Sequence, residues 1–162
     1  MRAEVSAGVN AFVARFGSVP TLAVVRVGGD PASERYARQI ERMFQRTGLG
    51  AHIHALPETT GQDELLDLVR MLNADARVHG ILLQVPLPPP IDRDTVVSAL
   101  APEKDVDGIH PLNAGHLLTG RGRYLVSATA LGGLELLRRA GCPVAGRHAV
   151  VVGRSAVVGK PL

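Results

Sequence analysis

Along this chain, segments with the apolar pattern of a strand alternate with segments that have the pattern of a helix. This order predicts strands that alternate with helices. Continuous apolar, β-branched runs predict buried strands over residues 20–27 and 80–85, and strict alternation predicts a half-buried strand over residues 50–56. Thr60 and Asp92 are the expected N-caps of two helices, and Gly48 is expected to end an earlier one. The expected helices cover residues 32–47, 60–73, 92–100, 113–118 and 129–139, and a last strand is expected over residues 148–152.

This order of elements predicts an α/β fold with a mainly parallel sheet, because short connections between alternating strands and helices produce parallel neighbours. Glycine and proline interrupt the pattern at Gly141–Gly146, just before the last expected strand. We therefore expect a domain boundary there. The ten residues from Gly153 onward are too few to form a domain by themselves.

Composition and charge exclude several functional classes. The chain has 162 residues, 46% of them apolar, with a net charge of +3 and no apolar run long enough to cross a membrane. Residues 1–16 lack the apolar centre of a secretory signal, and the single cysteine, Cys142, cannot form an internal disulfide. A reducing, cytoplasmic setting is expected. Five aromatic residues and no interleaved basic block argue against nucleic-acid binding.

Two charged or ligating clusters have simple interpretations. Four arginines fall at helical spacing, at positions 35, 38, 42 and 46, and Glu34 can pair with Arg38, so a solvated helix face is favoured over an anion site. His52 and His54 share a strand face, but no third ligand accompanies them, so no metal is expected.

A loop with possible phosphate chemistry follows the last expected strand. Gly153, Arg154 and Ser155 lead through Gly159 into a helix start, where glycines permit close approach and free N–H groups attract anions. The spacing is not that of the dinucleotide fingerprint, so an ordinary strand-to-helix turn is an equal alternative.

Three further positions are candidates for a site. Tyr36 lies in the first turns of a helix and, from the pattern alone, is favoured to pack on the sheet. Gln84 lies near the carboxyl end of a buried strand, where ligands gather, and a structural role is equally open. In the loop after Lys104, one of Asp105 and Asp107 is expected to pair with that lysine while the other faces a cleft; the alternative is a plain turn.

Several of these segments, in this order, resemble one enzyme family, the bifunctional methylenetetrahydrofolate dehydrogenase/methenyltetrahydrofolate cyclohydrolases. The resemblance covers nearly the whole chain. It rests on VGGDPASERY (27–36), LPETT (56–60), LNAD (72–75), GILLQVPLP (80–88), PEKDVDGIHPLNAG (102–115) and VVVGRSAVVGKP (150–161).

The resemblance implies a three-layer, folate-binding catalytic domain over residues 1–140 and the first strand and loop of a Rossmann-like NADP domain over residues 141–162. It implies oxidation of 5,10-methylenetetrahydrofolate by NADP, followed by hydrolysis to 10-formyltetrahydrofolate, in a cytoplasmic homodimer. Tyr36 and Gln84 match catalytic and folate-binding positions, and Asp107 matches the aspartate that binds the pterin ring. The residues Gly153, Arg154 and Ser155 match the start of the NADP phosphate loop.

This sequence departs from the family pattern in two places. Ile40 occupies the position of the catalytic lysine, and Ser127-Ala-Thr-Ala130 replaces a Pro-Cys-Thr-Pro segment. An aliphatic side chain cannot transfer a proton, so the cyclohydrolase step is expected to be weak. The alternatives are a folate-binding pseudoenzyme and, less compatible with the motifs, another nicotinamide oxidoreductase. The chain is expected to end one strand and one loop into the cofactor domain, and to be inactive alone.

Overall fold

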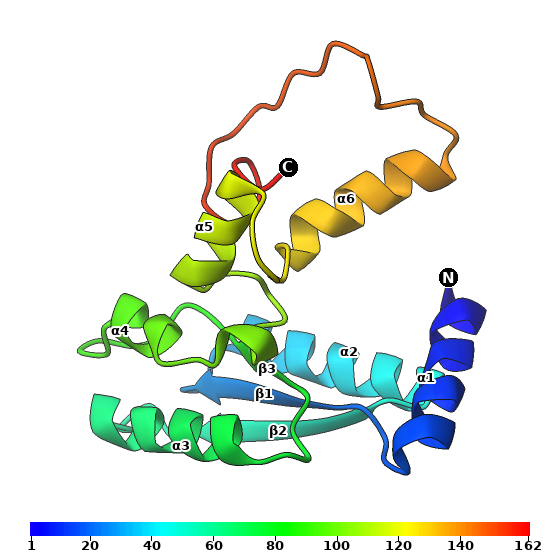
Figure 1. The fold of residues 1–162 in the computed structure, drawn as a ribbon. Coiled ribbons are helices and arrows are strands. Elements are labelled where there is room, and N and C mark those ends of the chain that lie inside the picture. The colour runs from blue at the N-terminus through cyan, green and yellow to red at the C-terminus, as the bar shows by residue number, and fades with distance from the viewer. The chain divides into compact units, whose positions relative to one another are not determined.

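Three parallel strands, β1 (Thr21–Val27), β2 (Gly50–Leu56) and β3 (Gly80–Leu83), form one sheet in the order β2–β1–β3 (Figure 1). Leu22 of the central strand lies opposite Ala51 on one side and Gly80 on the other. The ladder continues one residue past β3, because the Gln84 N–H donates to the Val25 carbonyl at 2.8 Å. All three predicted strands of this sheet are confirmed, and β3 is shorter than expected.

Helices cover both faces of this sheet, as the predicted three-layer architecture requires. The chain passes from β1 to β2 through α2 (Pro31–Thr47), then back across β1 to β3 through α3 (Gln62–Ala74). Right-handed crossovers in opposite directions place α2 and α3 on opposite faces. The helix α1 (Arg2–Phe16) packs against α2, and α4 (Arg93–Ser98) packs against α3 (Figure 1).

The helix ends follow from local chemistry. Asp30 caps α2 by accepting from the Ser33 N–H at 2.7 Å, and Gly48 ends that helix with a φ of 82°, which a residue with a Cβ rarely adopts. Asp92 caps α4, as predicted. The predicted cap by Thr60 is wrong: Gly61 is the N-cap of α3, and the Thr60 hydroxyl is buried without a hydrogen-bond partner. Threonine and glycine are both compatible with an N-cap position, so the residue type alone does not fix where α3 begins.

The structure describes residues 1–162, which divide into two compact units, Met1–Lys104 and Asp105–Leu162. The first unit contains the sheet and ends with a short 3₁₀ helix, Pro102–Lys104. The predicted division into domains over residues 1–140 and 141–162 stays a prediction. None of the helices is long and apolar enough to cross a membrane.

The second unit contains two helices, α5 (Pro111–Thr119) and α6 (Ala128–Arg139), both close to their predicted ranges. The strand predicted over His148–Val152 is not formed, and the Val152 side chain is 98% exposed. A strand is stabilised by hydrogen bonds to a neighbouring strand, and no segment of the second unit forms a strand with which residues 148–152 could pair. The apolar pattern alone therefore does not produce the element here.

Candidate functional site

A groove of about 530 Å³ lies at the carboxyl ends of the three parallel strands, the edge of an α/β sheet where ligands usually bind. It belongs entirely to the first unit. Its lining comes from the loops that follow β1, β2 and β3: Val27, Gly28, Gly29, Asp30, Glu58, Pro86, Leu87, Pro88 and Pro89. Tyr36 and Gln84 are not among the lining residues, although Gln84 lies two positions before Pro86.

The Gln84 side chain is buried and unbonded. It is 6% exposed, and neither its amide nitrogen nor its amide oxygen has a hydrogen-bond partner. A buried polar group without a partner destabilises a fold by about 1–3 kcal/mol. An unpaired amide at the ligand end of a strand is therefore typical of a group whose partner is a ligand.

Tyr36 and Ile40 lie one turn apart on α2 but in different environments. Tyr36 is 52% exposed, so the expectation that its ring packs on the sheet is wrong. Its ring is available to stack on a ligand. Ile40 is 9% exposed and is one of the buried residues of α2, with Ala37 and Thr47. The position at which the resemblance implies a lysine amine is here an apolar part of the core.

The two aspartates of the 105–108 loop have different roles. The Asp105 carboxylate is fully buried and accepts hydrogen bonds from the N–H groups of Ile109 (3.2 Å) and His110 (2.8 Å) and from the Asn113 amide (2.9 Å). The Asp107 carboxylate is half-buried and accepts no such bond. Its pKa is raised above the ordinary 3.8, first by burial and then by the nearby Asp105 charge. Asp105 thus shapes the loop, and Asp107 remains available to a ligand.

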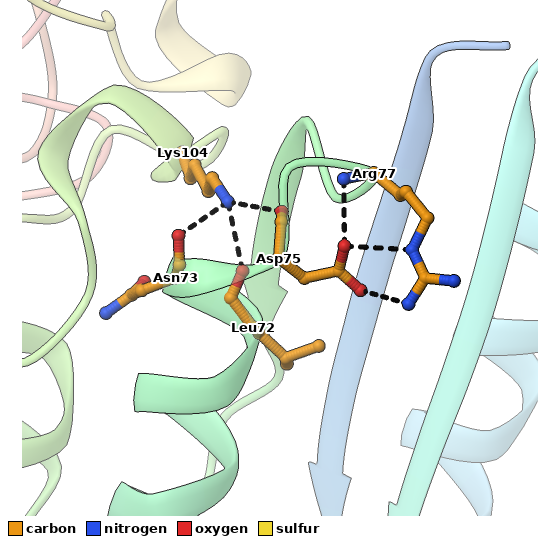
Figure 2. Close-up of polar contacts among 5 residues, drawn as sticks. All are labelled: Leu72, Asn73, Asp75, Arg77 and Lys104. Carbon is orange, nitrogen blue, oxygen red and sulfur yellow. Dashed lines mark hydrogen bonds and ion pairs between the residues drawn. The ribbon is translucent and has the colours of Figure 1, made fainter. Parts of the chain in front are cut away.

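Lys104 pairs with neither aspartate, which corrects the expected ion pair. Its ammonium instead donates to three main-chain carbonyls at the end of α3, in the first unit (Figure 2). The pairing was expected because the residues are adjacent in sequence. Unpaired helix-terminal carbonyls are strong acceptors for an ammonium, and a pattern read along the sequence does not show that they are near.

The phosphate-loop candidates lie at the end of the second unit. Ser155 Oγ accepts from the N–H groups of Val158 (3.1 Å) and Gly159 (3.3 Å), which closes a tight turn. A Cβ at Gly159 would lie 2.4 Å from the Gly153 carbonyl oxygen, so only glycine fits there. The Arg154 side chain is exposed. A narrow glycine turn beside a free guanidinium fits a phosphate group.

Sequence reasoning missed three residues that support these loops. Asn113 is buried, and its carbonyl oxygen accepts from the Leu125 N–H at 3.2 Å while its amide holds Asp105. The Ser127 hydroxyl donates to the Val157 carbonyl of the phosphate loop. A Cβ at Gly108 would lie 2.4 Å from the Ser127 nitrogen, so the aspartate loop packs directly on that residue. For Asn113 and Ser127 the signal is burial of a polar side chain, which sequence alone does not report.

Comparisons with known proteins assign the family. Residues 1–107 match the catalytic-domain model of tetrahydrofolate dehydrogenase/cyclohydrolase, and residues 127–162 match the NAD(P)-binding-domain model of the same enzymes. The chain belongs to the tetrahydrofolate dehydrogenase/cyclohydrolase family. Curated relatives named bifunctional protein FolD include one from Chloroflexus aurantiacus, 50% identical over all 162 residues, and one from Roseiflexus, 46% identical over the same length.

Solved structures of the tetrahydrofolate dehydrogenase/cyclohydrolase family share this fold. The bifunctional FolD enzyme from Campylobacter jejuni superposes with a TM-score of 0.91 at 36% identity, over 99% of this chain and 58% of that one. The Trypanosoma brucei FolD, solved with NADP cofactor and inhibitor, superposes with a TM-score of 0.90 at 33% identity, over 99% and 55%. The chain spans about half the length of the curated relatives it matches, 56% of the first two.

Proposed function

We propose that the full-length protein oxidises 5,10-methylenetetrahydrofolate to 5,10-methenyltetrahydrofolate with NADP, and that it hydrolyses the product to 10-formyltetrahydrofolate only weakly. The observation that supports the first half is the buried, unbonded amide of Gln84 near the carboxyl end of β3, a position that the resemblance assigns to folate binding. Family membership supplies the reaction class.

Three side chains are proposed to hold the folate. The exposed ring of Tyr36 stacks on the substrate, and the Gln84 amide donates to or accepts from it. The Asp107 carboxylate accepts hydrogen bonds from N–H groups of the pterin ring, because it is the unbonded carboxylate of its loop. Oxidation depends mainly on holding substrate and cofactor in the reactive orientation, which these residues can do without a proton-transferring group.

The cofactor is proposed to bind at the glycine turn. Arg154 and the N–H groups that begin the turn at Ser155 hold a phosphate of NADP, and Gly153 and Gly159 leave room for it. NADP, when bound, supplies the hydride acceptor.

Hydrolysis of the methenyl product is proposed to be slow because of Ile40. Adding water to this carbon requires a group that accepts and returns a proton, and a positioned acid or base typically contributes ~10²–10⁴ in rate. The side chain at position 40 is aliphatic and buried. The two activities should therefore separate in this protein, although they occur together in bifunctional relatives.

A second candidate function is a folate-binding protein without turnover. Ile40 favours it, since the loss of a catalytic lysine is how such a pseudoenzyme would arise. A two-step assay on the full-length protein distinguishes the candidates. We expect NADPH to form from methylenetetrahydrofolate, while added methenyltetrahydrofolate disappears little faster than in buffer. Tight folate binding with no NADPH would instead establish the pseudoenzyme.

The setting is proposed to be the cytoplasm, and the assembly a homodimer. The single cysteine, exposed at position 142, is compatible with a reducing compartment. Light scattering of the full-length protein at several concentrations tests the dimer, since a monomeric mass throughout would contradict it.

A further inference from the structure

The end of helix α3 is capped by a side chain that lies about thirty residues further along the chain. No glycine ends this helix: its C-cap, Asp75, has an extended backbone with φ −75° and ψ 111°. Lys104 Nζ donates to the carbonyls of Leu72 (3.0 Å), Asn73 (2.7 Å) and Asp75 (2.8 Å) (Figure 2). An ammonium has three donors, so every one of them is used on the main chain.

A second side chain joins the same two segments. The Asn73 amide donates to the Ala99 carbonyl at 2.7 Å, and its oxygen accepts from the Ala101 N–H at 2.9 Å. Five hydrogen bonds therefore hold residues 99–104 on the last turn of α3. We call these five bonds the α3 clamp.

The α3 clamp is directional and not an ordinary ion pair. The carboxylate of Asp75, whose main-chain carbonyl accepts from Lys104, is itself bonded to Arg77 through the main-chain N–H (2.9 Å), Nε (3.0 Å) and Nη2 (2.8 Å) (Figure 2). Those contacts hold the pKa of Asp75 down at about 2, and the charge of Lys104 adds only a minor part. Lys104 is thus positioned by carbonyls that converge on it, which fixes both its place and its direction.

The chain that leaves the α3 clamp enters the loop of the proposed folate carboxylate. Lys104 is the last residue of the first unit, and only Asp105 and Val106 separate it from Asp107. Asp105 fixes the shape of that loop from within the second unit. The α3 clamp holds the residue immediately before this loop, Lys104, on the end of α3.

We propose that Lys104 is a positioning residue for folate binding: its ammonium, held by the end of α3, fixes the start of the loop that carries Asp107. This inference rests on the proposed role of Asp107. A lysine that merely capped a helix would affect stability alone, whereas a positioning lysine also affects how tightly folate binds.

The test compares Lys104→Met with Arg77→Met in the full-length protein. Both variants remove one cation at the end of α3, but the Arg77 side chain is exposed and its hydrogen bonds go to Asp75. We expect Lys104→Met to raise the KM for methylenetetrahydrofolate about tenfold and to change the KM for NADP less than twofold, because misplacing one contact group weakens one ligand. Arg77→Met should change neither KM by more than twofold. Lys104→Arg keeps the charge but cannot direct three donors to converging carbonyls, so its effect on the folate KM should be intermediate. If Lys104→Met does not fold, the same comparison is made with Lys104→Arg.

Amide hydrogen exchange supplies a readout that needs no activity. Exchange over residues 105–110 should be faster in Lys104→Met than in the unmodified protein and unchanged in Arg77→Met. A lower melting temperature with unchanged folate KM and unchanged exchange would overturn the inference. An unmodified protein that binds no folate would contradict the proposed function, and the exchange rates would still decide whether Lys104 holds the loop.

Discussion

The side-chain amide of Asn113 donates a 2.9 Å hydrogen bond to the buried carboxylate of Asp105, and this bond separates the roles of two aspartates in one loop. Asp105 is fully bonded within its own unit, whereas Asp107, two residues later, keeps a carboxylate with a raised pKa and no such partner. Stability should therefore depend on the first aspartate, and ligand binding on the second.

Asp105→Ala should destabilise the full-length protein by about 3 kcal/mol, because it leaves two main-chain N–H groups and the Asn113 amide buried without an acceptor. Urea unfolding monitored by circular dichroism measures this change. Asp107→Asn, in the same loop, is the matched control and should not lose stability. A loss below about 0.5 kcal/mol in Asp105→Ala would show that its hydrogen bonds are not needed.

Asp107→Asn should weaken folate binding at least tenfold at pH 7, since an amide offers one acceptor oxygen where the carboxylate offers two. The difference in stability between the unmodified protein and the Asn variant should also depend on pH. Because burial raises the pKa of Asp107 above 3.8, the folded state keeps this proton longer than the unfolded state. The unmodified protein should therefore lose stability, relative to the Asn variant, as pH rises from 3.8 through the raised pKa.

Paired unfolding curves at several pH values and titration with a folate ligand test both parts of that prediction. A relative stability that rises over this pH range would mean that Asp107 is stabilised as a carboxylate in the folded protein. Unchanged folate affinity in the Asn variant would remove Asp107 from the proposed site.

Gln84→Leu should make the protein more stable and less active. Replacing a buried, unbonded amide by an apolar side chain of similar size removes a desolvation penalty of about 1 kcal/mol or more. The same change removes a proposed contact to folate, so kcat/KM for methylenetetrahydrofolate should fall at least tenfold. Gln39→Leu, on the exposed face of α2, is the control and should change neither quantity. A less stable Gln84→Leu protein would show that the amide has a structural partner.

Ile40→Lys should increase methenyltetrahydrofolate hydrolysis by about 10²-fold while changing NADP-dependent oxidation only a few-fold. The new amine would enter a buried position, so the variant should also be less stable. Ile40→Met, which has similar volume and no amine, separates the chemistry from the packing change. If the unmodified protein already hydrolyses this substrate as fast as the Lys variant, then another residue transfers the proton and Ile40 does not limit the reaction.

Residues 1–162 by themselves should not oxidise methylenetetrahydrofolate. The segment that leads into the phosphate loop forms no strand, and Val150 and Val152 are exposed. A nicotinamide site needs an ordered sheet behind that loop. Methenyl product measured by absorbance in the presence of NADP is the test. Steady turnover above the rate without protein would contradict the prediction.

The sequence by itself determined the three strands and the helices α2, α3 and α4 of the first unit, because their causes are local. A continuous apolar run predicted β1 and β3, alternation predicted β2, and Gly48 and Asp92 marked helix ends through bonds that span four residues or fewer. The motifs also carried the family resemblance that the comparisons confirm.

Tertiary structure alone decided the matters that depend on residues distant in sequence. It placed Lys104 on the end of α3 instead of beside an aspartate, and it left Tyr36 exposed while burying Ile40 one turn away. It also left residues 148–152 without strand structure despite their apolar pattern. In each case the pattern gives a residue's preference, but hydrogen bonds and burial depend on which other segment lies beside it, and local sequence does not contain that information.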